Sequence, residues 1–257
     1  MRTIRKLTLA LTLSGTLVTT SSIALAKPAD VAAAVANAGA RSEDNVKLDE
    51  SRKPAGVLNF LGLKRGDQAI DLFGANRYWA EIIAPAVGPK GHVTVWEPTQ
   101  FYGKESADKF AAFQQKAGNT HLIVSPFEAI ALDANSYDFA MLNLNYHDVY
   151  WESTKYGVKR MDPDAFVKTV YASMKPGGVV GVIDHVGNPG DTRETVEKYH
   201  RIDPAVVKAD FERAGFKLEA ESDLLKNAAD DHSLLVFDDK IRGKTDRFLF
   251  KFRKPKN

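Results

Sequence analysis

Short apolar runs alternate with amphipathic segments through the middle of the chain. The runs hold four to eight residues and are rich in branched and aromatic side chains, which is typical of buried β-strands. They cover residues 68–73, 92–96, 121–124, 137–144 and 179–183. Between them, helical periodicity predicts helices over residues 77–87, 104–117 and 162–174. Because strands alternate with helices, the pattern predicts an α/β fold with a parallel sheet and right-handed crossovers.

The flanking segments extend this prediction at both ends. Residues 27–39 are rich in alanine and predict a short helix, and residues 57–63 carry an apolar face that predicts another. A further helix is predicted over residues 204–214. The last strands of the sheet are predicted at residues 216–220, 233–237 and 247–252, the final two as an antiparallel hairpin around residues 239–245. With no internal repeat and no low-complexity linker, residues 27–257 are predicted to form a single domain.

The first 26 residues have the layout of a secretory signal peptide. Arg2, Arg5 and Lys6 precede an apolar run over residues 7–25, which ends in Ala-Leu-Ala before Lys27. Several Ser and Thr residues interrupt the run, so it is a weak candidate for a membrane span. We expect cleavage after Ala26 and an exported, periplasmic protein without stable membrane insertion; an uncleaved anchor is the alternative.

Charge and cysteine content narrow the possible partners and chemistry. Removing residues 1–26 takes away three of the 35 basic residues and none of the 33 acidic ones, so the predicted mature protein is nearly neutral. This balance gives no reason to expect a nucleic-acid partner. The chain has no cysteine, which excludes disulfides, a thiol nucleophile and thiolate metal sites.

A candidate ligand site follows the first predicted strand. In a doubly wound sheet, ligands bind where the strands end, and the loop after the first strand meets the polar part of the ligand. Glu97 ends the next strand, where a carboxylate can accept both hydroxyls of a ribose. The pattern therefore indicates a nucleoside-containing ligand. The candidate binding residues are Asp71, Gly74, Ala75, Asn76, Arg77, Glu97 and Asn143.

Several motifs along the chain together resemble one protein family. They are Arg52-Lys53-Pro54, residues 64–66, 71–81 and 84–91, Lys175-Pro176-Gly177-Gly178, residues 245–248 and residues 252–255. In these motifs the chain is similar to exported class I S-adenosylmethionine-dependent methyltransferase-like proteins of bacteria. The resemblance implies a Rossmann-like sheet of about seven mostly parallel strands with an antiparallel last strand, and S-adenosylmethionine as cofactor.

The loop after the first strand departs from the family pattern. Members usually carry glycines where this chain has Ala75, Asn76 and Arg77, because a backbone that approaches the cofactor closely needs freedom at positive φ. Asn76 tolerates left-handed geometry. Three alternatives remain for Arg77: pairing with the carboxylate of the cofactor, filling the pocket so that the cofactor is excluded, or opening the next helix and pointing to solvent.

The segment after the fourth predicted strand, residues 143–151, combines polar and aromatic side chains suited to a small-molecule substrate pocket. Methyl transfer to oxygen or nitrogen requires an unprotonated nucleophile, so a nearby base helps. His147 is the candidate base, and Asp148 is the candidate group that orients it. The alternative is that both side chains cap the loop by bonding backbone groups.

Polar residues at the end of the fifth predicted strand raise the question of a metal. Asp184 and His185, with Asn143 and Asp148, partly resemble the divalent-metal sites of catechol-type methyltransferases. The ligand spacing is incomplete, so no metal is assigned, and Asp184 is expected to bond a neighbouring loop instead. His200 receives no role in the site.

Two functions of different kinds follow. The first is an S-adenosylmethionine-dependent methyltransferase acting on a small molecule. The second is a catalytically inactive relative that serves as an exported ligand-binding or interaction module, which the replaced glycines and the predicted export favour. A dinucleotide-dependent dehydrogenase is a weaker third interpretation, because the first loop lacks the glycine triplet that a pyrophosphate needs.

Overall fold

The structure is a computed structural model that describes residues 27–256. A seven-stranded sheet forms the centre of the protein. The predicted signal peptide lies outside the described residues. The strands are β1 (Gln68–Leu72), β2 (His92–Pro98), β3 (Thr120–Ser125), β4 (Tyr137–Asn143), β5 (Met174–His185), β6 (Lys217–Ser222) and β7 (Arg247–Arg253). Their order in the sheet is β3-β2-β1-β4-β5-β7-β6, with β7 antiparallel to both β5 and β6 and the other pairs parallel. The prediction of a mostly parallel sheet with an antiparallel last strand is confirmed.

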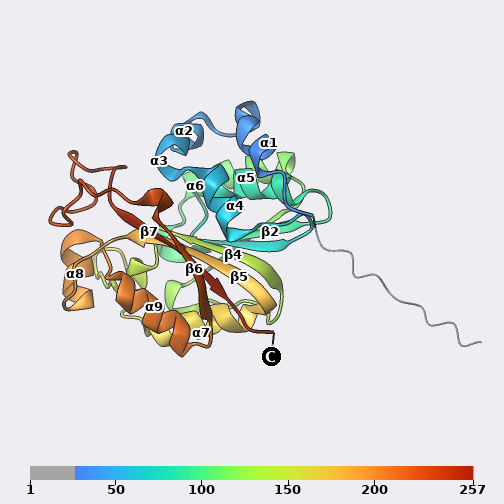
Figure 1. Cartoon of the computed structure of the whole chain (residues 1–257). Helices are drawn as coiled ribbons and strands as arrows, with labels where there is room; N and C mark the ends of the chain where they lie inside the picture. Colours follow the sequence, from blue (N-terminus) through green and yellow to red (C-terminus); the bar gives the residue numbers. More distant parts are fainter. Residues whose placement is uncertain (1–26, 257) are drawn as a thin grey trace, which may run out of the picture.

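Helices cover both faces of this sheet (Figure 1). They are α1 (Val31–Ala36), α2 (Glu43–Val46), α3 (Asp49–Arg52), α4 (Pro54–Leu61), α5 (Tyr78–Val87), α6 (Lys104–Lys116), α7 (Pro163–Ser173), α8 (Thr192–Tyr199) and α9 (Pro204–Arg213). Helices α1, α4, α5 and α6 contribute to one apolar cluster, and α7 and α9 contribute to the other. Within the described part of the chain, no helix has both the length and the apolar character needed to cross a bilayer.

The central strands separate the two apolar clusters by strict alternation. In β1, Ile70 and Leu72 face the α7 side of the sheet, whereas Ala69 faces the α5 side. Successive side chains of a strand point to opposite faces, so a strand buried on both sides is apolar at nearly every position. This explains why continuous apolar runs, rather than alternating ones, predicted the parallel strands.

The prediction of a strand over residues 233–237 is wrong. In the structure this segment is a loop, and β7 pairs with β5 and β6 instead of forming a hairpin with it. The fully buried guanidinium of Arg201 holds the segment: its Nε donates to the carbonyl of Leu234 at 3.0 Å, and its Nη1 pairs with Asp230 at 2.9 Å. The segment is therefore held by a buried side-chain anchor and not by pairing with a strand, and of its apolar residues Val236 is buried whereas Leu235 and Phe237 are exposed.

The sheet has its switch point between β1 and β4, where the strand order reverses. Each strand is followed directly by a non-glycine residue in the left-handed region. These residues are Phe73 after β1 and Leu144 after β4, both with φ 60°. Such a conformation turns the chain sharply and costs energy for residues with a Cβ. The two turns lie at the switch point, where β1 and β4 end.

Candidate functional site

A cavity of about 500 Å³ lies at the carboxyl ends of β1 and β4. It touches the loop after β1 at Asn76 and the segment after β4 at Asn143 and His147. Its other lining residues are Arg52, Phe101, Leu144, Asn145, Asp148, Trp151, Tyr156, His185, His200, Val236 and Phe237. The volume falls in the ~300–1,000 Å³ range of small-molecule sites. The position at the switch point is where the sequence predicted the ligand.

Gly74 is required by the carboxyl group of Asp71 beneath it. A Cβ at position 74 would lie 2.5 Å from Oδ2 of Asp71 and 2.6 Å from its Cγ. Distances this short force a shift, because Asp71 is itself 2% exposed and closely packed. The glycine at this position thus allows the loop to lie directly against the end of β1.

Asp71 is a buried carboxyl whose charge is poorly compensated. Burial, reinforced by the nearby carboxylate of Glu97, raises the pKa of Asp71 to about 8, although the Arg52 guanidinium opposes the shift. Its Oδ2 and the Nη1 of Arg52 are both buried and have no hydrogen-bond partner among the described residues. Unpaired buried polar atoms are rare in proteins. Arg52 lines the cavity, where its unpaired nitrogen is suited to a ligand, whereas Asp71 lies beneath the loop and does not line the cavity.

Glu97 holds the loop after β1 in place. Its Oε2 accepts a hydrogen bond from the backbone N–H of Ala75 at 2.9 Å. Burial raises the pKa of Glu97 to about 7; the Ala75 N–H opposes the shift and Asp148 adds to it. Glu97 does not line the cavity in this conformation, so its predicted contact with a ribose stays a prediction.

The side chain of Arg77 lies outside the cavity at the switch point, so its predicted contact with the cofactor stays a prediction. Arg77 is the N-cap residue before α5, with φ 65°, and its Nε lies 3.4 Å from Oε1 of Glu81. It lines a separate hollow beside Arg41 and not the cavity at the switch point. Arg77 therefore neither fills the predicted cofactor pocket nor reaches into it.

Asn76, in contrast, lines the cavity and is fixed on two sides. Its Oδ1 accepts from the backbone N–H of Tyr78 at 2.9 Å, and its carbonyl accepts from Nδ2 of Asn45 at 3.0 Å. Asn45 also donates to Glu81 at 3.0 Å. Asn45 belongs to the polar segment before α4, for which the sequence predicted no helix or strand. This segment therefore fixes the loop after β1 in position through hydrogen bonds.

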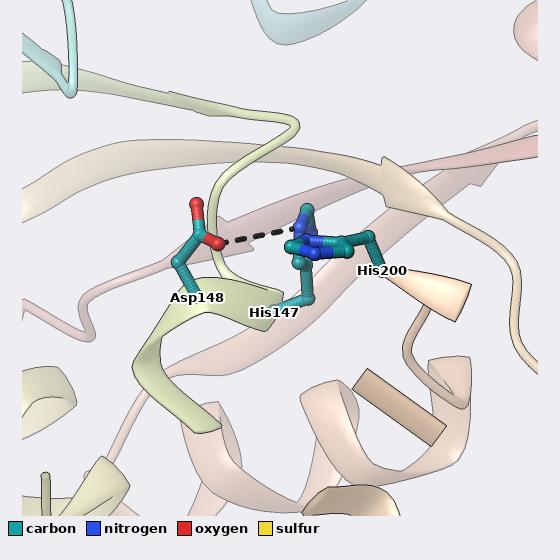
Figure 2. A group of neighbouring side chains, drawn as sticks. All are labelled: His147, Asp148 and His200. Atoms are coloured by element: carbon teal, nitrogen blue, oxygen red, sulfur yellow. Dashed lines mark ion pairs between the residues drawn. The ribbon is translucent and has the colours of Figure 1, made fainter. Parts of the chain in front are cut away.

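His147 and Asp148 lie at the start of the 3-10 helix η4 (His147–Tyr150), and both are buried in the cavity wall. Nδ1 of His147 lies 2.8 Å from Oδ1 of Asp184, and its backbone N–H donates to Oδ2 of the same carboxylate at 2.8 Å. Nε2 of His147 lies 3.5 Å from Oδ1 of Asp148, as the dashed line in Figure 2 shows. The expected bond between Asp184 and a neighbouring loop is confirmed.

The predicted role of His147 as a base stays a prediction, and its electrostatic surroundings favour the protonated ring. Burial favours the neutral ring, but the carboxylates of Asp184 and Asp148 outweigh it and raise the pKa of His147 to about 9. An imidazole with this pKa carries a proton at neutral pH and cannot accept another. The main orienting group is Asp184, since Asp148 faces the opposite nitrogen and also accepts from Nδ2 of Asn145 at 2.9 Å.

The structure also brings residues into the site that sequence reasoning missed. His200 follows α8 in left-handed geometry at φ 50°, and its ring centroid lies 5.5 Å from that of His147. Arg52 reaches the cavity from α3, and its guanidinium lies 4.3 Å from the ring centroid of Tyr78. Neither has a local spacing signal, because each comes from a segment distant in sequence.

His185 lines the cavity as a neutral ring, since burial lowers its pKa to about 3.

Comparison with known proteins relates this architecture to one group of folds. No protein-family model matches the chain, and no curated protein sequence matches it significantly. Among solved structures, it is similar to an S-adenosylmethionine-dependent methyltransferase from Aquifex aeolicus, with 18% identity, 88% of this chain and 98% of that chain covered, and a TM-score of 0.57. A methyltransferase of the same cofactor class from Mesorhizobium loti has 14% identity, coverage of 80% and 99%, and a TM-score of 0.54.

A third similar structure carries a different activity in its name. The (4+2)-cyclase SpnF has 13% identity, covers 90% of this chain and 87% of its own, and gives a TM-score of 0.58. At these identities the comparisons establish the fold, the Rossmann-like fold of S-adenosylmethionine-dependent methyltransferases. The reaction has to be argued from the residues of the site.

Proposed function

We propose that the protein is an S-adenosylmethionine-dependent methyltransferase whose acceptor is a small molecule bound in the cavity at the switch point. The observation that carries this proposal is the extent of that cavity. It reaches from Asn76, in the loop after β1, to His147, in the segment after β4. A nucleoside cofactor over the first loop and an acceptor beside η4 would therefore share one cavity, as transfer between them requires.

The residues around the first loop fit the cofactor. Arg52 lines the cavity and has a buried, unpartnered nitrogen, while Asp71 lies beneath the loop and Gly74 lets the loop lie directly against it. We assign Arg52 to the carboxylate of the methionine part, the role considered for Arg77, because a guanidinium pairs well with a carboxylate. Asn76 and Asn143 line the space beside it. When bound, S-adenosylmethionine supplies an electrophilic methyl group on its sulfonium sulfur.

The acceptor end of the cavity is polar on one side and aromatic on the other. Protonated His147 faces the cavity with its Nε2 beside Asp148, so it can donate a hydrogen bond that orients an acceptor oxygen. Removal of the acceptor's proton then falls to the carboxylate of Asp148. Trp151, Tyr156 and Phe237 supply apolar surface for the rest of a small molecule.

The test of turnover is transfer of a labelled methyl group. The purified protein is incubated with methyl-labelled S-adenosylmethionine and a low-molecular-weight extract of its host cells. We expect label in small molecules with the wild type and with Arg160→Ala, an exposed control outside the cavity. We expect at least tenfold less label in small molecules with Arg52→Ala, since loss of a charged hydrogen bond costs about 1.5–3 kcal/mol.

The inactive ligand-binding module remains the second candidate, favoured by the raised pKa of His147, which leaves the site without the expected base. Cofactor binding and product formation, measured together, distinguish the methyltransferase from the inactive module. Binding of S-adenosylhomocysteine without any labelled product would support the inactive module. Product formation that depends on Arg52 would exclude it.

We also propose that the protein is exported to the periplasm after cleavage behind Ala26. The basic start, the interrupted apolar run and the Ala-Leu-Ala sequence before Lys27 support this. N-terminal sequencing of the protein from a periplasmic fraction should begin at Lys27. Recovery of the intact N-terminus from the cytosol would contradict the proposal.

A further inference from the structure

Two imidazoles and one carboxylate meet at the acceptor end of the cavity. His147, Asp148 and His200 each offer one potential ligand atom, and these three atoms lie within 4.8 Å of one another. Figure 2 shows Asp148 and His147 leaving η4 side by side, with His200 approaching from another segment. We propose that these three residues form a binding site for one divalent first-row transition-metal ion such as Zn²⁺.

Hydrogen bonds outside the cluster orient two of the three ligands. Asp184 accepts from Nδ1 of His147 at 2.8 Å, which leaves Nε2 to face Asp148 and the cavity. Asn145 donates to Oδ2 of Asp148 at 2.9 Å, which leaves Oδ1 on the side of His147. A histidine held through its second nitrogen by a carboxylate is the usual arrangement around protein metal ions. The ion would take the place of the proton on Nε2, so the hydrogen bond from protonated His147 and the proton removal by Asp148 described above apply to the metal-free site.

The third ligand is positioned by aromatic contacts and by the backbone. The ring of His200 lies between Trp151 and Phe237, with centroid distances of 5.6 and 5.1 Å. Its left-handed backbone at φ 50° ends α8 and turns the side chain towards η4. All three ligands line the cavity, so the remaining coordination positions face its interior and are open to water or a substrate atom.

The donor set selects the class of ion. Mg²⁺ and Ca²⁺ prefer oxygen ligands, whereas two imidazoles with one carboxylate suit Zn²⁺, Fe²⁺ or Co²⁺. The chain has no cysteine, so thiolates cannot compete for these ions. The set differs from the one considered from sequence, because both oxygens of Asp184 are already engaged with His147. This site does not depend on the proposed methyl transfer, and it can be tested without the cofactor.

The experiment uses untagged protein, treated with a chelator and dialysed, and titrated with Zn²⁺ by calorimetry and with Co²⁺ by visible absorption. We expect one saturable site per chain and the absorption bands of Co²⁺ bound to nitrogen and oxygen. His200→Asn is the main variant, because Asn tolerates left-handed geometry and removes the imidazole. His121→Ala removes an exposed histidine from β3 and is the matched control.

We expect His200→Asn to abolish the Co²⁺ bands and His121→Ala to leave them unchanged. Asp184→Asn should weaken the affinity by about 10–100-fold, as loss of an orienting partner usually does. Circular dichroism establishes that each variant is folded. Absence of a one-to-one site in the wild type, or equal binding by folded His200→Asn, would overturn the proposal. Binding of S-adenosylhomocysteine is measured separately, so failure of the metal site and failure of the methyltransferase proposal remain distinguishable.

Discussion

Asp184 accepts two hydrogen bonds from His147, one from the backbone N–H and one from Nδ1 of the ring, each at 2.8 Å. The first fixes where η4 begins above β5, and the second fixes which edge of the imidazole faces the cavity. One fully buried carboxylate at the end of β5 therefore determines both the position and the orientation of the main polar group after β4. The acceptor side of the cavity depends on this pair.

The first prediction concerns the proton on His147 in metal-free protein. Its pKa is raised to about 9, so its charge stabilises the fold below the ordinary value of 6.5, and this stabilisation is lost as the pH rises through about 9. Nuclear magnetic resonance of the ring in chelator-treated protein should show titration near pH 9. Asp184→Asn should lower that value by more than one unit. A ring that titrates near 6.5 in the wild type would contradict the geometry.

Substitution of Gly74 should damage the cofactor loop specifically. Gly74→Ala places a Cβ 2.5 Å from Oδ2 of Asp71, and overpacking of this kind costs about 1–3 kcal/mol. We expect a lower melting temperature and loss of S-adenosylhomocysteine binding. Gly118→Ala is the control, because no atom lies within 4 Å of its added Cβ. Equal behaviour of the two variants would show that the loop does not lie against Asp71.

Asp71 should destabilise the unliganded protein at neutral pH. Its pKa is raised to about 8, so the stability associated with its protonated form is full below about pH 4 and is lost as the pH rises to about 8. The loss is at most about 1.4 kcal/mol per pH unit. Denaturant unfolding of Asp71→Asn should therefore show an advantage over the wild type that grows from pH 5 to pH 8. Exposed Asp239→Asn should show no such trend.

Arg201 should anchor the loop that replaces the predicted strand. Arg201→Ala leaves Asp230 buried without its partner, and breaking a buried pair from one side costs about 3–5 kcal/mol. We expect a large fall in the free energy of unfolding and faster proteolysis between residues 231 and 244 under native conditions. Cleavage at the wild-type rate in this segment would mean that other contacts hold it.

The fold could be predicted from the sequence because its signals are local. Continuous apolar runs marked the parallel strands, and the family motifs pointed to the methyltransferase fold. Residues 233–237 have the same composition as a strand, yet they form a loop whose backbone Arg201 holds at the carbonyl of Leu234. No local pattern reveals an anchor that lies 33 residues away from the carbonyl it holds.

The site was predictable only in part, for a related reason. Position along the chain placed Asn76, Asn143, His147 and Asp148 at the strand ends, where the cavity lies. The sequence pattern could not show that the side chain of Arg77 pairs with Glu81 instead of lining the cavity. It also could not show that Arg52 and His200 line the cavity. Nor could it give the charge of His147, which depends on two carboxylates, one of them on another strand. Such contacts are set by tertiary packing.

The most direct test of the account is calorimetric titration of the purified protein with S-adenosylmethionine and S-adenosylhomocysteine. We expect saturable one-to-one binding of both, at least tenfold weaker in Arg52→Ala and unchanged in Arg160→Ala, because Arg52 offers an unpartnered guanidinium nitrogen at the cavity. Absence of heat and of any thermal shift at millimolar ligand in the folded wild type would contradict the account. The cavity would then belong to a different ligand on a methyltransferase fold.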